Sequence, residues 1–66
     1  MIDFDRLYLE IENILQEQDV ALSIEFKSMT KNKSPKEVYL WCSANLKSVD
    51  HERLRQVLMD FYYSVR

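Results

Sequence analysis

Apolar residues recur at helical spacing near the start of the chain. From about Asp3 to Gln18 an apolar residue falls at nearly every third or fourth position, which predicts an amphipathic helix. Asp3 is the expected N-cap, and Ile2 and Leu7 have the spacing of a hydrophobic staple around it. Leu9 falls almost opposite the apolar stripe, so we expect its side chain to be exposed.

The end of the chain shows the same periodicity. A second helix is predicted from about Ser48, its expected N-cap, to Arg66. Met59 and Tyr63 lie four residues apart, away from the predicted core stripe. The core stripe contains five apolar residues: Leu54, Val57, Leu58, Phe61 and Val65.

Between the helices the pattern changes to alternation. Residues Val20 to Lys27 alternate apolar and polar positions, which is typical of a strand with one buried face. A second strand is predicted for Glu37 to Ala44, and the polar loop Met29 to Lys36, which holds the only proline, would join the two. The predicted fold class is therefore α+β. It is a small single domain over residues 1–66, with a two-stranded antiparallel hairpin packed against two helices and a sheet that could extend across a dimer.

The second predicted strand is apolar on both faces. Val38, Leu40, Cys42 and Ala44 would point to one side, and Tyr39 and Trp41 to the other. One small core covers one face of such a sheet, so the aromatic face is covered either by other parts of the chain or by a partner. Aromatic residues dominate binding energy at interfaces. The candidate protein interface therefore consists of Tyr39, Trp41, Met59, Tyr63 and Leu9.

Charge is unevenly distributed along the chain. Residues 1–25 carry seven acidic residues against one arginine, a net charge of −6, and residues 26–47 carry five lysines against one glutamate, a net charge of +4. One interpretation is that both are ordinary solvated surfaces. A second is an acidic helix face that selects a basic partner protein: Asp5, Glu10, Glu12 and Glu17. A third is a set of nucleic-acid contacts beside Trp41 and Tyr39: Lys27, Lys31, Lys33 and Lys36.

Few residues could form a disulfide, bind a metal or act in catalysis. Cys42 and His51 are each the only residue of their type, so one chain forms neither a disulfide nor a Cys/His metal site. The chain has no glycine, and the glycine-rich loops that bind nucleotide phosphates are absent. No cofactor, metal or catalytic residue is expected, and the protein is predicted not to be an enzyme.

These patterns favour a non-enzymatic protein–protein interaction module, such as a small regulator, inhibitor or adaptor that forms a homodimer. The alternatives are a nucleic-acid-binding regulator that uses the lysine-rich loop, or a small structural subunit of a larger, phage-like assembly. No apolar run approaches the roughly 20 residues that cross a bilayer, and acidic residues interrupt the N-terminal segment. We therefore expect a cytoplasmic protein without a membrane partner.

Overall fold

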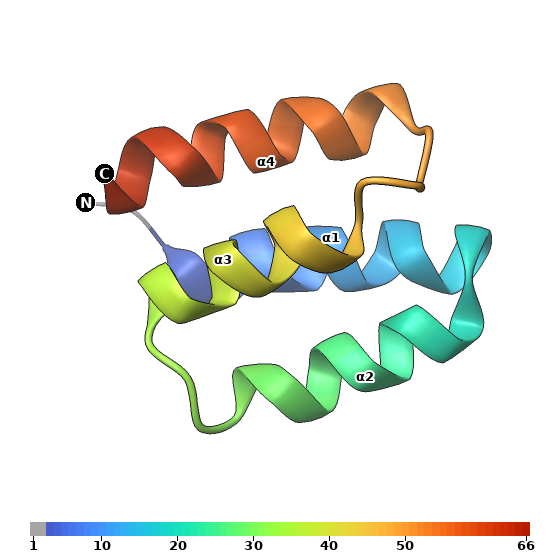
Figure 1. The fold of residues 1–66 in the computed structure, drawn as a ribbon, viewed down its shortest axis with the longest axis horizontal. Coiled ribbons are helices and arrows are strands. Elements are labelled where there is room, and N and C mark those ends of the chain that lie inside the picture. The colour runs from blue at the N-terminus through green and yellow to red at the C-terminus, as the bar shows by residue number, and fades with distance from the viewer. Residues whose placement is uncertain (1–2) are drawn as a thin grey trace.

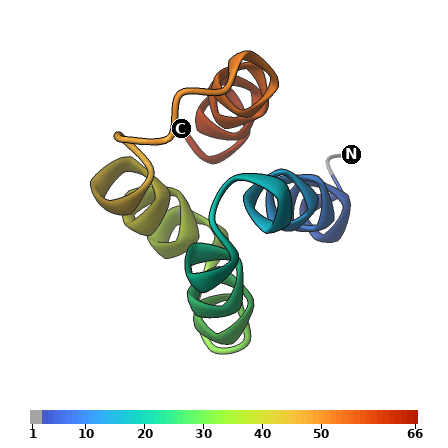
Figure 2. The same cartoon turned by 90° about the vertical axis from the view of Figure 1, so that its right-hand side faces the viewer.

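The chain forms four helices that run alternately up and down. The computed structural model describes residues 3–66. Its helices are α1 (Phe4–Gln18), α2 (Val20–Thr30), α3 (Pro35–Asn45) and α4 (Glu52–Val65). Helix α1 packs against α2 and α4, and α3 packs against α4 (Figure 1). Seen end-on, the helices surround one core, with α2 and α4 on opposite sides of it (Figure 2).

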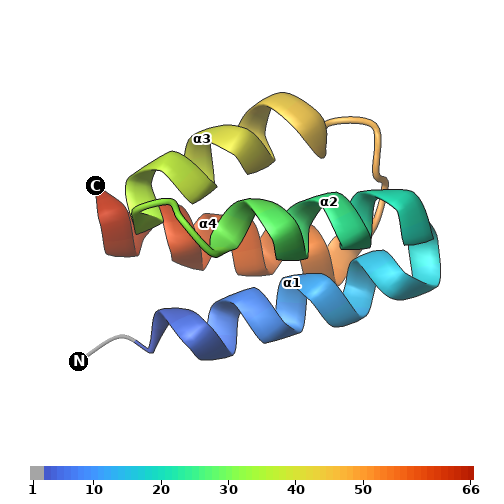
Figure 3. The ribbon, with the colours of Figure 1, turned by 90° about the horizontal axis from the view of Figure 1, so that it is seen from below.

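The predicted α+β fold is wrong. Within residues 3–66 the structure contains no strand, and both predicted strands are helices. In the view from below, α2 lies beside α1, and α3 follows it through a short connection (Figure 3). The sheet-edge dimer that the sequence suggested therefore has no strands from which to form.

Helix α2 was mistaken for a strand because its apolar residues surround it. Leu22 and Phe26 are four residues apart and face the core, whereas Val20 and Ile24 are 60% and 65% exposed. Two apolar pairs on opposite sides of a helix produce the same alternation as a strand. Asp19 favours a helix over a strand here. Its carboxylate accepts a hydrogen bond from the backbone N–H of Leu22 at 3.3 Å and caps α2.

Helix α3 begins with a capping box that the sequence analysis assigned to a loop. The Ser34 hydroxyl accepts a bond from the Glu37 backbone N–H, and the Glu37 carboxylate accepts one from the Ser34 backbone N–H. Pro35 occupies the first helical position, where its missing N–H costs nothing. The buried residues Val38 and Cys42 then follow at helical spacing.

The two terminal helices were predicted with unequal accuracy. The bounds of α1 and the Asp3 cap are confirmed, since the Asp3 carboxylate accepts from the Arg6 backbone N–H at 3.3 Å. Ile2, the proposed staple residue, lies outside the described residues. The predicted start of the last helix is wrong, because α4 begins at Glu52 and is capped by His51 rather than by Ser48.

The ring of Phe61 is the centre of an aromatic cluster that joins three helices. Phe61 is fully buried in α4. Its centroid lies 5.9 Å from that of Phe4 and 5.8 Å from that of Tyr8, both in α1, and 5.7 Å from that of Tyr39 in α3. Such tilted and edge-on pairs add stability beyond the area that they bury.

Phe26 brings the remaining helix into the same cluster. Its centroid lies 6.1 Å from that of Tyr8 in α1 and 5.8 Å from that of Trp41 in α3. The hydroxyl of Tyr8 is enclosed and has no hydrogen-bond partner within residues 3–66. Burial raises the pKa of Tyr8, with smaller contributions from the charges of Asp5 and Cys42. Tyr8 therefore belongs to the core, although its hydroxyl is polar.

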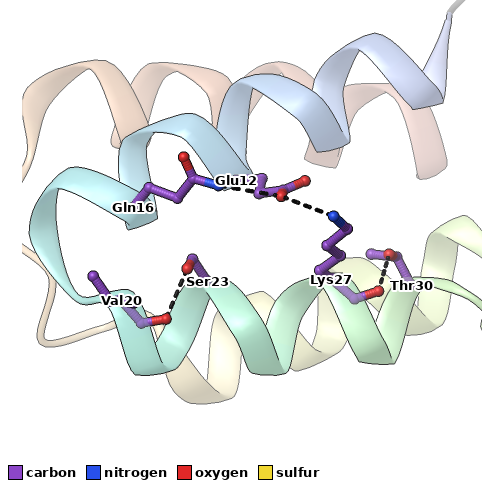
Figure 4. Close-up of polar contacts among 6 residues, drawn as sticks. All are labelled: Glu12, Gln16, Val20, Ser23, Lys27 and Thr30. Atoms are coloured by element: carbon purple, nitrogen blue, oxygen red, sulfur yellow. Dashed lines mark hydrogen bonds and ion pairs between the residues drawn. The ribbon is translucent and has the colours of Figure 1, made fainter.

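Polar contacts also connect α1 and α2 (Figure 4). Glu12 of α1 accepts a hydrogen bond from Gln16 at 3.4 Å and lies 3.9 Å from the Lys27 ammonium of α2. Ser23, buried between these helices, donates its hydroxyl proton to the Val20 carbonyl at 2.7 Å. The buried Ser23 hydroxyl therefore needs no hydrogen-bond partner from α1, and α1 can pack closely against α2.

The two serines Ser34 and Ser48 test this assignment of helix starts. Ser34→Ala should lower the free energy of unfolding by about 1 kcal/mol, since it removes a cap. Ser48→Ala is the matched control and should change it by less than about 0.5 kcal/mol, because Ser48 is exposed and caps no helix. Urea unfolding followed by circular dichroism measures both. A larger loss from Ser48→Ala would contradict the structure.

Candidate interaction surface

The two residues with potential for nucleophilic chemistry have structural roles. Cys42 is 1% exposed, and burial raises the pKa of its thiol to about 12. The thiol therefore stays protonated at neutral pH and is a poor nucleophile. His51 accepts the Leu54 backbone N–H on its Nδ1 atom at 3.2 Å. Within residues 3–66 no three His, Cys, Asp or Glu side chains come together to hold a metal.

Tyr39 and Trp41, the expected interface pair, lie on different flanks of α3. Tyr39 packs on Phe61 and on Tyr62, whose ring centroid is 5.5 Å away. Trp41 packs on Phe26, and both interface candidates are half-buried. They do not form one aromatic face, and replacing either of them would also disturb the core.

The four acidic residues predicted as a partner face are also divided. Glu10 turns toward α4 and accepts a hydrogen bond from Nε of Arg53 at 2.8 Å. Glu12 turns toward α2 and pairs with Lys27. Asp5 and Glu17 are exposed on opposite flanks of α1. Two of the four carboxylates are thus neutralised within the chain.

A shallow apolar groove lies where α2 leads into α3. It has a volume of about 280 Å³ and is lined by Met29, Lys33, Glu37, Leu40 and Trp41. Leu40 is 58% exposed, whereas Met29 and Trp41 are half-buried. Lys33 and Glu37 lie 3.8 Å apart as an ion pair. We call this site the α2–α3 groove.

Of the four lysines predicted as nucleic-acid contacts, Lys33 lines this groove, and Lys31 and Lys36 are close in sequence to residues that line it. Lys27 pairs with Glu12 and Lys33 pairs with Glu37. Lys31 and Lys36 are exposed and pair with no carboxylate in the described part of the chain. The groove therefore has an apolar floor and two uncompensated positive charges nearby.

Sequence reasoning missed Leu40, Val20 and Ile24 as surface residues. All three were assigned to the buried faces of strands, yet each is more than half exposed. Helical spacing from the correct caps would have revealed them, because Leu40 falls on the opposite side of α3 from Val38 and Cys42.

The three remaining interface candidates are exposed, as predicted. Leu9 is 57% exposed on α1, and Met59 and Tyr63 are 54% and 62% exposed on α4. Tyr62 is 43% exposed, and its ring centroid lies 5.5 Å from that of Tyr63. Whether they contact a partner stays a prediction, but α4 clearly presents apolar side chains to solvent.

Comparison with protein-family models, with curated proteins and with solved structures gave no match. The interpretation of the surface therefore depends on its own geometry and charge.

Across residues 3–66, each helix is too short or too polar to cross a membrane.

The buried thiol of Cys42 should make the protein sensitive to alkali. Above its ordinary pKa of 9.0 the unfolded chain loses the thiol proton while the folded chain keeps it. The free energy of unfolding should then fall by about 1 kcal/mol between pH 9 and pH 10. Burial of Tyr8 adds a fall of the same sign above its ordinary pKa of 10.0.

Urea unfolding at pH 7, 9 and 10 measures this effect, with Cys42→Ala as the control. The variant should lose some stability at every pH but should show a shallower decline between pH 9 and pH 10. Parallel pH profiles for the two proteins would show that Cys42 is not buried as described.

Proposed function

We propose that the protein is a non-enzymatic interaction module that binds a short segment of a partner protein in the α2–α3 groove. The observation that carries this proposal is an exposed leucine and a half-buried tryptophan in one groove. Close to them in sequence are two exposed lysines that pair with no carboxylate in the described part of the chain. An apolar floor with a charged surround is the usual anatomy of a small protein interface.

The charges of the groove specify the kind of partner. Lys31 and Lys36 are free to pair with carboxylates, whereas the Lys33–Glu37 pair is already satisfied. The complementary segment carries one large apolar side chain, which covers Leu40, flanked by aspartate or glutamate residues. This replaces the basic partner expected from the sequence, because Glu10 and Glu12 already pair with Arg53 and Lys27 of the same chain.

Nucleic acid is a weaker candidate for the same surface. Base stacking needs an open aromatic face, and Trp41 is half-buried against Phe26. Lys27 and Lys33 already have carboxylate partners. Only two of the four predicted lysines are left to contact phosphates, which is few for measurable affinity at physiological salt.

The test is a selection from a random peptide library displayed against the whole protein. We expect the selected peptides to share an apolar residue flanked by acidic ones. Leu40→Glu should weaken binding of a synthesised, selected peptide by at least about tenfold, because it puts a like charge into the groove. Fluorescence anisotropy measures the affinity, and circular dichroism checks that the variant is folded.

Leu9→Glu is the matched control, because Leu9 has almost the same exposure as Leu40 but lies on α1. It should leave peptide binding unchanged. The proposal fails if no acidic peptide is selected, or if Leu40→Glu binds as well as the original protein. Salt-sensitive binding of an oligonucleotide that Leu40→Glu leaves intact would instead assign the lysines to nucleic acid.

A further inference from the structure

Helix α4 carries a second stripe on the face that points away from the core. Its positions follow alternating steps of four and three residues, the spacing at which two helices pack along a seam. All five residues are exposed, and Met59 and Tyr63 are 54% and 62% exposed. The outer stripe consists of Glu52, Gln56, Met59, Tyr63 and Arg66.

The inner stripe of the same helix has this spacing too, and the bundle already covers it. Leu54, Leu58, Phe61 and Val65 all pack in or against the core. The inner face of α4 is therefore covered by its own bundle, whereas the outer stripe is exposed.

The charges of the outer stripe are complementary to themselves. Glu52 and Arg66 lie seven residues before and after Met59, which is about 10 Å in each direction along the helix. If two α4 helices pack antiparallel with Met59 at the crossing, each glutamate approaches the arginine of the other copy. Parallel packing would instead bring like charges together at both ends.

We propose that the outer stripe of α4 binds a second copy of this chain in an antiparallel, two-fold symmetric dimer. Met59 packs against Met59 at the symmetry axis, and Tyr63 covers the flank of that contact. Arg66, whose guanidinium carbon lies 5.8 Å from the Tyr63 ring centroid, is held where Glu52 of the second copy approaches. A symmetric contact of this kind uses one patch twice and closes without forming a chain.

The dimer leaves the α2–α3 groove open. Helices α2 and α4 lie on opposite sides of the bundle (Figure 2), so two copies joined through α4 would present two outward grooves. This inference does not rest on the proposed function, because none of the residues of the outer stripe lines the groove. A single pair of helices of this length buries a small area, so we expect a weak dimer in rapid exchange.

The first test is the solution mass by sedimentation over a concentration series from about 10 µM to about 1 mM. The mass should rise from 8.0 kDa toward twice that value. Met59→Glu places two carboxylates at the symmetry axis and should keep the protein monomeric throughout. Leu9→Glu adds the same charge at a similarly exposed leucine and should dimerise normally. A constant mass, or a dimer that survives Met59→Glu, overturns the proposal.

The second test uses charge reversal to establish the antiparallel arrangement. Glu52→Arg and Arg66→Glu should each weaken the dimer by about tenfold or more, since symmetry applies each change twice. Mixing the two single variants should restore affinity, because every pair across the interface then joins opposite charges. Failure of the mixture to associate more tightly than either variant alone would exclude the antiparallel contact.

Met59→Glu also separates the two proposals. A monomeric variant that still binds the selected acidic peptide supports independent surfaces. Loss of peptide binding together with the dimer would overturn the claim that the α4 contact leaves the groove open.

Discussion

The contact of Phe61 with Tyr8 and Tyr39 holds the bundle together, because it joins α4 to α1 and α3 at one point. The ring of Tyr8 also packs against that of Phe26, which connects α2 to the same cluster. A helix of eleven residues, such as α2 or α3, is marginal alone in water and depends on this packing. Losing one buried phenylalanine ring costs about 3–5 kcal/mol, which is comparable with the whole stability of a domain of this size. Helix formation and core packing should therefore be strongly coupled.

The small aromatic core also explains why several apolar residues are exposed at the surface. A cluster of aromatic rings fills a small core, so each helix needs only a narrow stripe to reach it. The apolar residues outside those stripes stay in contact with solvent: Leu9, Val20, Ile24, Leu40 and Met59. Monomeric proteins tolerate such residues singly, but a groove or a continuous stripe of them indicates a partner. Leu40 beside Trp41 in the α2–α3 groove and Met59 beside Tyr63 on α4 are two places where apolar side chains gather at the surface in this way.

The parts of the fold that the sequence predicted well are those with an unambiguous period. Helix α1 and the core face of α4 have one apolar stripe each, and Leu9, Met59 and Tyr63 were correctly placed outside it. The middle of the chain failed because α2 and α3 are apolar on more than one side, which imitates a strand. Local caps carried the missing information, since Asp19 and the Ser34–Glu37 box each start a helix. The α2–α3 groove depended on that assignment and could not be found without it.

The most direct test of the account is backbone chemical-shift assignment of the protein by NMR, with distances measured from the Phe61 ring. We expect helical Cα shifts throughout 20–30 and 35–45, and close contacts from the Phe61 ring to Phe4, Tyr8 and Tyr39. Strand-type shifts across 20–27 and 37–44, with contacts between the backbones of the two segments, would contradict the four-helix fold and restore the hairpin.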